Sequence, residues 1–122
     1  IFYTHPPQET DTMNHPPLPN PRQCRKIPPQ FSWVDHRLVR EHYFEQCSLD
    51  AMAFYLFLVT VADARGISYY SQPRLMKCLR LGTARLMQLR AELMDAGLIA
   101  YQHPLYQVLS LGPETVAGDS HD

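Results

Sequence analysis

Residues 71–111 read SQPRLMKCLRLGTARLMQLRAELMDAGLIAYQHPLYQVLSL and decide the fold. Ser71 is a candidate N-cap for a helix, because its hydroxyl can accept a backbone N–H and the nearby Pro73 needs no donor in the first turn. A glycine and a threonine interrupt the pattern. A further helix is predicted from Thr83 or Ala84 to Ala96, ended by Gly97. The pattern therefore predicts two helices joined by a tight turn.

Two short segments follow, Leu98 to Gln102 and Tyr106 to Leu111, separated by His103-Pro104-Leu105. Their β-prone residues on either side of a proline-containing turn predict a β-hairpin. Two helices, a tight turn and a hairpin in this order are typical of a winged helix-turn-helix domain.

The preceding residues supply the rest of the domain. A first amphipathic helix is predicted from an N-cap at Ser32 to about Gln46, and a second, apolar helix from an N-cap at Ser48 to Asp63-Ala64-Arg65, with Gly66 in the C′ position. Residues 67–70 are short and β-prone. The expected fold is mainly α with a small β-hairpin: a winged helix-turn-helix of about four helices plus a two- or three-stranded wing.

Proline marks the expected domain boundary. Eight of the 11 prolines precede residue 30, where apolar periodicity is absent, so residues 1–29 are predicted to be a disordered tail. Residues 30–112 are predicted to form the winged helix-turn-helix domain. Residues 113–122 are polar and acidic and are predicted to be a flexible C-terminal tail.

Length and composition restrict the possible functions. The chain has 122 residues and a formal net charge of −1, which is room for one domain and provides no global basic field for nucleic acid. No secretory signal is expected, since the first thirty residues lack an apolar h-region, and the longest apolar run, residues 51–62, falls short of the roughly 20 residues that span a bilayer. Three cysteines without a CxxC spacing favour the reducing cytoplasm, and Cys47 and Cys78 are predicted to be core residues.

The sequence from Ser71 to Leu75, with Leu79, Gly82-Thr83-Ala84-Arg85-Leu86, Leu93 and Ala96-Gly97-Leu98-Ile99, resembles the helix-turn-helix core of MarR-like and GntR-like bacterial regulators. The longer stretch from Phe31 through Leu111 also resembles small winged-helix proteins that accompany bacterial mobile elements or replication genes. The resemblance implies sequence-specific binding of double-stranded DNA by a cytoplasmic transcriptional regulator or an accessory protein of such an element.

Local charge supports that expectation. Residues 66–112 contain five Lys and Arg against two Asp and Glu, a local charge of +3. Spacing places Arg74, Lys77 and Arg80 on one arc of their helix, suited to phosphates, while Leu86, Leu89 and Leu93 form the packing face of the next. The predicted DNA-binding residues are Arg74, Lys77, Arg80, Thr83, Ala84, Arg85, Gln88, Gln102 and His103.

Individual roles follow from donor and acceptor chemistry. Arg85 can fork to the O6/N7 edge of guanine, Gln88 can pair with adenine, and Thr83 can hold the helix N-terminus near a phosphate. Arg90 falls on the apolar arc, so it is predicted to snorkel or to pair with a carboxylate such as Asp63. The wing tip around His103 has no Lys or Arg, which argues against insertion into the minor groove.

The alternative is a non-catalytic protein-interaction module with the same fold. The aromatic residues of the first two predicted helices are interpreted as core, with a homodimer surface as the alternative. No nucleotide-binding loop, metal-ligand set or nucleophile motif is present, so no enzyme activity, cofactor or metal is expected, and the sequence indicates no effector ligand.

Overall fold

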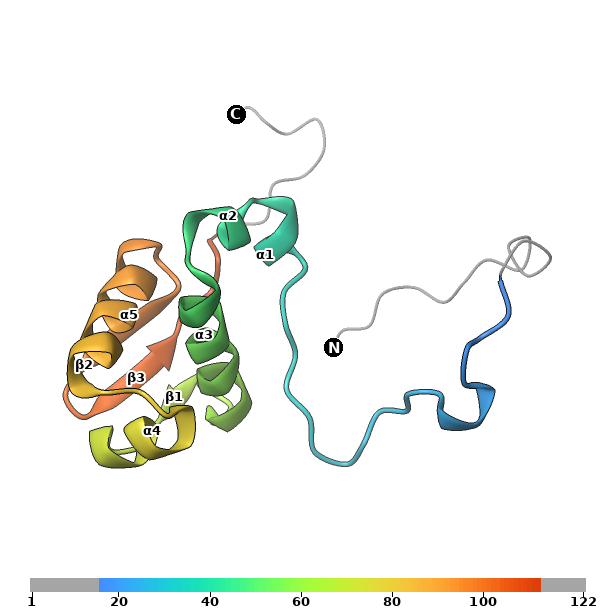
Figure 1. Cartoon of the computed structure of the whole chain (residues 1–122), viewed down its shortest axis with the longest axis horizontal. Coiled ribbons are helices and arrows are strands. Elements are labelled where there is room, and N and C mark those ends of the chain that lie inside the picture. The colour runs from blue at the N-terminus through green and yellow to red at the C-terminus, as the bar shows by residue number, and fades with distance from the viewer. Residues whose placement is uncertain (1–15, 113–122) are drawn as a thin grey trace. The chain divides into compact units, whose positions relative to one another are not determined.

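The computed structural model describes residues 16–112, which divide into two units after Val34 (Figure 1). In the first unit, residues 16–34 are exposed, with one 3-10 turn, η2 (Pro21–Gln23), in which the Asn20 side chain accepts the Arg22 N–H. The predicted tails at 1–15 and 113–122 lie outside the described residues.

The second unit has the predicted fold class. Its described part contains the helices α1 (Arg37–Arg40), α2 (Tyr43–Gln46), α3 (Leu49–Val61), α4 (Gln72–Leu79) and α5 (Thr83–Asp95) and the strands β1 (Ile67–Ser68), β2 (Ile99–Gln102) and β3 (Leu105–Val108). The strands form an antiparallel sheet in the order β1-β3-β2. This arrangement is a helix-rich, winged-helix-like fold, in which α4 and α5 occupy the helix-turn-helix position.

The caps of the central helices follow the sequence. Ser48 Oγ accepts the Ala51 N–H at 3.1 Å and begins α3, and Ser71 Oγ accepts the Arg74 N–H at 3.4 Å and begins α4. At the other end of α5, Gly97 adopts φ +77° and the helix stops, as predicted.

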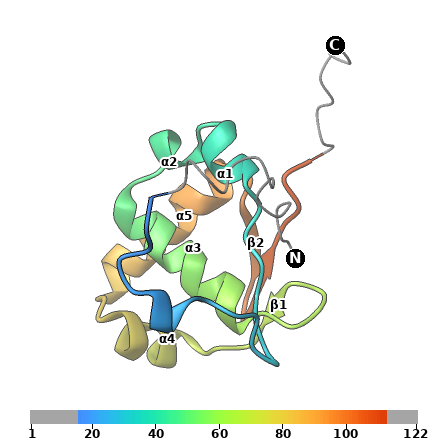
Figure 2. The ribbon, with the colours of Figure 1, turned by 90° about the vertical axis from the view of Figure 1, so that its right-hand side faces the viewer.

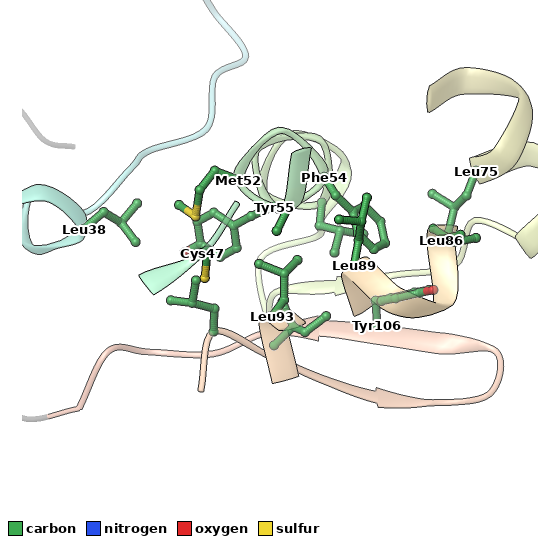
Figure 3. Close-up of a cluster of buried hydrophobic side chains, with 14 residues drawn as sticks. Leu38, Cys47, Met52, Phe54, Tyr55, Leu75, Leu86, Leu89, Leu93 and Tyr106 are labelled. Carbon is green, nitrogen blue, oxygen red and sulfur yellow. The ribbon is translucent and has the colours of Figure 1, made fainter. Parts of the chain in front are cut away.

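The core confirms the packing face of α5. Leu86, Leu89 and Leu93 are fully buried against α3, where Phe54 and Leu58 are also buried (Figure 3). These contacts hold the sheet, α3 and α5 together as one hydrophobic cluster.

The first predicted helix is wrong in its extent. Residues 32–36 are not helical; α1 begins only after Asp35, whose Oδ1 accepts the Arg37 N–H at 2.9 Å. His42, at φ +66°, then separates α1 from α2. Both short helices pack on the same core, so their apolar residues continue one helical spacing. The spacing alone therefore does not reveal the break between them.

Three further local predictions need correction. The helix α3 ends at Val61, and Gly66 lies in the turn to β1, where its N–H donates to the Asp63 carbonyl at 2.9 Å. Cys78 is exposed rather than buried, whereas Cys47 is buried as predicted. In the hairpin, Leu105 belongs to β3 and pairs with Gln102, so the loop is His103-Pro104, joined by a cis peptide bond.

The helices at the two ends of the second unit are well separated. Figures 1 and 2 both show α1 and α2 at one end of α3 and α4 at the other. The aromatic residues of α2 therefore lie far from the basic residues of α4.

Candidate nucleic-acid interface

The basic residues of α4 lie on its exposed side. Leu75 is fully buried and fixes the rotation of the helix, so Arg74 and Lys77 face solvent. Arg80 is also exposed and ends the helix in the left-handed region at φ +56°, with its N–H donating to the Met76 carbonyl. The three cations therefore lead from α4 into the turn before α5.

In the part of the chain that the structure describes, no carboxylate neutralises these cations. Within residues 16–112, Arg74, Lys77 and Arg80 take part in no ion pair. Arg74 stacks its guanidinium on the Tyr70 ring, 4.4 Å from the centroid, which orients the side chain without removing its charge. This surface can attract an anion.

The beginning of α5 is open. Gly82 is the N-cap and supplies no capping side chain, and Thr83 and Ala84 are both exposed. The Thr83 hydroxyl contacts Met76 Sδ at 3.6 Å, which connects the start of α5 to α4. The first-turn N–H groups of α5 therefore extend the cationic surface of the preceding helix.

Arg85 has two partners that the spacing did not indicate. Its Nη2 donates to Asp50 Oδ2 at 2.9 Å, and its Nη1 donates to Gln88 Oε1 at 2.8 Å. The side chains of Arg85 and Asp50 remain 40% and 62% exposed. Two predicted base-contacting residues are thus joined to each other and to a carboxylate on α3.

Sequence reasoning missed Asp50. Asp50 lies in the first turn of α3, where its negative charge stabilises the positive end of the helix dipole. This local role explains an acidic residue there without any contact to α5. Only the packing of α3 along α5 brings its carboxylate to Arg85.

Glu92 makes a second contact between α5 and α3. Its carboxylate accepts from the Ser48 backbone N–H and from Ser48 Oγ, the latter at 3.1 Å. Glu92 therefore binds the start of α3. Asp95, at the end of α5, is exposed.

Arg90 turns inward, as predicted, but to a different partner. Its Nη1 donates to the Tyr106 hydroxyl at 2.8 Å, and its guanidinium lies 4.1 Å from the centroid of the Tyr101 ring. Burial raises the pKa of Tyr106 despite this contact. The expected partner Asp63 instead accepts the N–H groups of Arg65 and Ile67, so Arg90 connects α5 to the hairpin.

The hairpin tip carries the remaining candidates. Gln102 and His103 are exposed, and His103 Nδ1 lies 3.2 Å from the Tyr101 hydroxyl. Since the tip has no Lys or Arg, it adds little positive charge to the cationic surface of α4.

Other kinds of site find no support in the described residues. Between residues 16 and 112, no group of three His, Cys, Asp or Glu side chains is placed to hold a metal ion. Across the same residues, no helix combines the length and apolar character needed to cross a bilayer.

Comparison with known proteins does not identify a family for this chain. No protein-family model matches the chain, and no curated protein matches it. Among solved structures, the chain is similar to one titled "Structure of Rep-DNA complex", at 16% sequence identity and a TM-score of 0.48, over 67% of this chain and 75% of that one. A likeness of this degree does not place the chain in a family.

Proposed function

We propose that the second unit binds double-stranded DNA through α4 and α5. The observation that carries the proposal is the run of exposed cations, Arg74, Lys77 and Arg80, that form no ion pair within the described residues and lead into the open N-terminus of α5. In a helix-turn-helix the second helix enters the major groove by its N-terminal residues while flanking cations contact phosphates. The exposed cations therefore lie where a helix-turn-helix places its phosphate contacts.

The contacts divide by chemistry. Arg74, Lys77 and Arg80 would contact phosphates, since exposed cations attract every sequence alike. Arg85 and Gln88 would meet base edges, because they stand on the first two turns of α5 with several polar groups still exposed. Gln102 and His103 would lie beside the duplex with a minor role.

The Asp50 carboxylate changes what Arg85 contributes. Paired at 2.9 Å, the two side chains carry no net charge together, so Arg85 adds little to the general attraction for phosphates. Lys77 has no such partner among residues 16–112. The two residues should therefore respond differently to salt.

The test compares Lys77→Ala and Arg85→Ala in the full chain on duplex DNA. Lys77→Ala should weaken binding to all sequences and reduce the slope of log K against log salt by about one unit. Arg85→Ala should reduce discrimination between sequences at a cost of about 1 to 3 kcal/mol. Because Arg85→Ala alone leaves the Asp50 charge unpaired, the slope is compared in the double variant with Asp50→Ala, which removes no net charge and should leave the slope almost unchanged.

Arg40→Ala is the matched control. Arg40 is exposed on α1, at the far end of the unit, so its loss removes one positive charge away from the interface. Equal effects of Lys77→Ala and Arg40→Ala would reject the interface on α4.

The proposed role in the cell is that of a bacterial transcriptional regulator or an accessory protein of a mobile element or replication system, in the cytoplasm. Sequence-specific binding of DNA would suit either role. The two are distinguished by where selected binding sites lie, beside promoters or beside a replication or transfer origin.

A second candidate is a non-catalytic protein-interaction module. Exposed apolar side chains on α2 and α3 favour it: Phe44 is 46% exposed, Leu49 79% and Leu56 56%. A homodimer through this surface is one form of the proposal. Sedimentation of the wild-type chain and of the Leu56→Glu variant, each measured alone, distinguishes a homodimer from a module that binds another protein. A homodimer through this surface should dissociate in the variant.

A further inference from the structure

The network of Asp50, Arg85 and Gln88 fixes how α5 can meet a base. Arg85 is held on two sides, by Asp50 Oδ2 at 2.9 Å and by Gln88 Oε1 at 2.8 Å. A guanidinium has five N–H donors and no acceptor, so three donors remain for a ligand. The contacts hold Arg85 in one orientation before any ligand arrives.

The same contact determines the orientation of the Gln88 amide. Only the amide oxygen can face Arg85, because the opposite orientation would set the NH₂ group of Gln88 against a donor. The NH₂ group is consequently turned away from Arg85. Its two N–H donors are the part of Gln88 that is left for a partner.

A glutamine in this state is poorly suited to adenine. Adenine presents one acceptor, N7, and one donor, the N6 amino group, and a glutamine recognises it with both its oxygen and its NH₂ group. In Gln88 the oxygen already accepts a hydrogen bond from a cation, which leaves it a weaker acceptor for N6–H. Guanine presents two acceptors, N7 and O6, and requires donors only.

We infer that Asp50, Arg85 and Gln88 form a donor-only recognition unit that selects guanine in the major groove, and that Asp50 is its positioning residue. The inference rests on the proposed binding of DNA and names the base edge that the interface takes. Asp50 does not touch the base. It acts from α3 by orienting Arg85, which in turn orients Gln88.

Pre-orientation matters because a free arginine samples many rotamers and loses that freedom on binding. With Asp50 in place, Arg85 loses its rotamer freedom when the protein folds. Binding of the correct base then costs less conformational entropy. Without Asp50, Arg85 gains a full positive charge for phosphates and loses its fixed direction. The expected signature is tighter or equal binding with less discrimination.

The experiment selects sites from a random duplex library with the full chain and then measures affinities for the selected site and its single-base variants. The variants are Asp50→Ala and, as the matched control, Asp95→Ala. Asp95 is also exposed but stands at the end of α5, outside the network. Both changes remove one negative charge, and circular dichroism checks that each variant folds.

The wild type should select guanine at one or two adjacent positions, with a preference over adenine of about tenfold or more. Asp95→Ala should keep this preference. Asp50→Ala should reduce it to within about threefold while overall affinity stays equal or rises. A purely structural role for Asp50 would instead weaken all sequences together.

Four results would overturn the inference. Selection of adenine would contradict the assigned state of Gln88, and an Asp50→Ala profile matching that of Asp95→Ala would remove Asp50 from recognition. Binding without base preference would reject the recognition unit while leaving the proposed function intact. Absence of any binding would reject both, and is thereby distinguishable from the other outcomes.

Discussion

Gly66 provides a direct test of how the hairpin is joined to the helices. It adopts φ +86° between α3 and β1, and a Cβ added there would lie 2.8 Å from the Val108 carbonyl oxygen. That oxygen belongs to the backbone of β3, next to the Val108 N–H that donates to the Gly66 carbonyl at 2.8 Å. Neither backbone can move aside without breaking this contact.

The expected cost of Gly66→Ala has two parts. A left-handed conformation costs a non-glycine residue about 1 to 2 kcal/mol, and overpacking in a closed position adds about 1 to 3 kcal/mol. The smaller entropy of the unfolded alanine chain returns about 0.4 to 1 kcal/mol. Gly66→Ala should therefore destabilise the protein by roughly 1 to 4.6 kcal/mol, with a central value of about 3 kcal/mol.

Two other glycines serve as controls. Gly97 has φ +77° but open space where an alanine methyl group would lie, so Gly97→Ala should cost only about 1 kcal/mol. Gly82 has φ −80° and open space, so Gly82→Ala should change stability by less than about 0.5 kcal/mol. Urea unfolding followed by circular dichroism measures all three, and equal losses for Gly66→Ala and Gly97→Ala would refute the close approach to Val108.

Two further predictions concern side-chain contacts. Arg90→Met should cost about 1 to 3 kcal/mol, because the hydroxyl of Tyr106, a residue only 2% exposed, loses its donor; the cost should shrink when Tyr106→Phe is already present, as a double-mutant cycle measures. Hydrogen bonds from Arg37 hold the pKa of Asp35 below its usual 3.8, so Asp35 stabilises the fold above that pH and this contribution disappears as pH falls through the lowered pKa. Urea unfolding from pH 7 to about 2.5 should show a weaker acid dependence for Asp35→Asn than for the wild type, and parallel curves would contradict the assignment.

Much of the helix-turn-helix could be predicted because its signals are local. Ser48 and Ser71 accept N–H groups of their own first turns, and Gly97 satisfies a backbone requirement at one residue. The apolar spacing of α5 directly reports the side that packs on α3. Such features depend on neighbours within one helical turn, which the sequence displays.

The remaining features depend on contacts between distant residues. Asp50 and Arg85 are 35 positions apart, and nothing in either helix alone indicates that they meet. The spacing of Arg90 correctly predicts that it faces inward, but its partner Tyr106 comes from the hairpin. The prediction that Cys78 is buried is wrong. It lies on the same arc of α4 as the buried Leu75, but the buried face of the helix is too narrow to include it.

Binding of the full chain to a labelled random duplex by fluorescence anisotropy, at several salt concentrations between roughly 50 and 200 mM, tests the central claim most directly. Exposed Arg74, Lys77 and Arg80, with Arg85 neutralised by Asp50, predict measurable affinity and a slope of log K against log salt of about −3. Absence of binding at the lowest salt, or an affinity that does not change with salt, would contradict it.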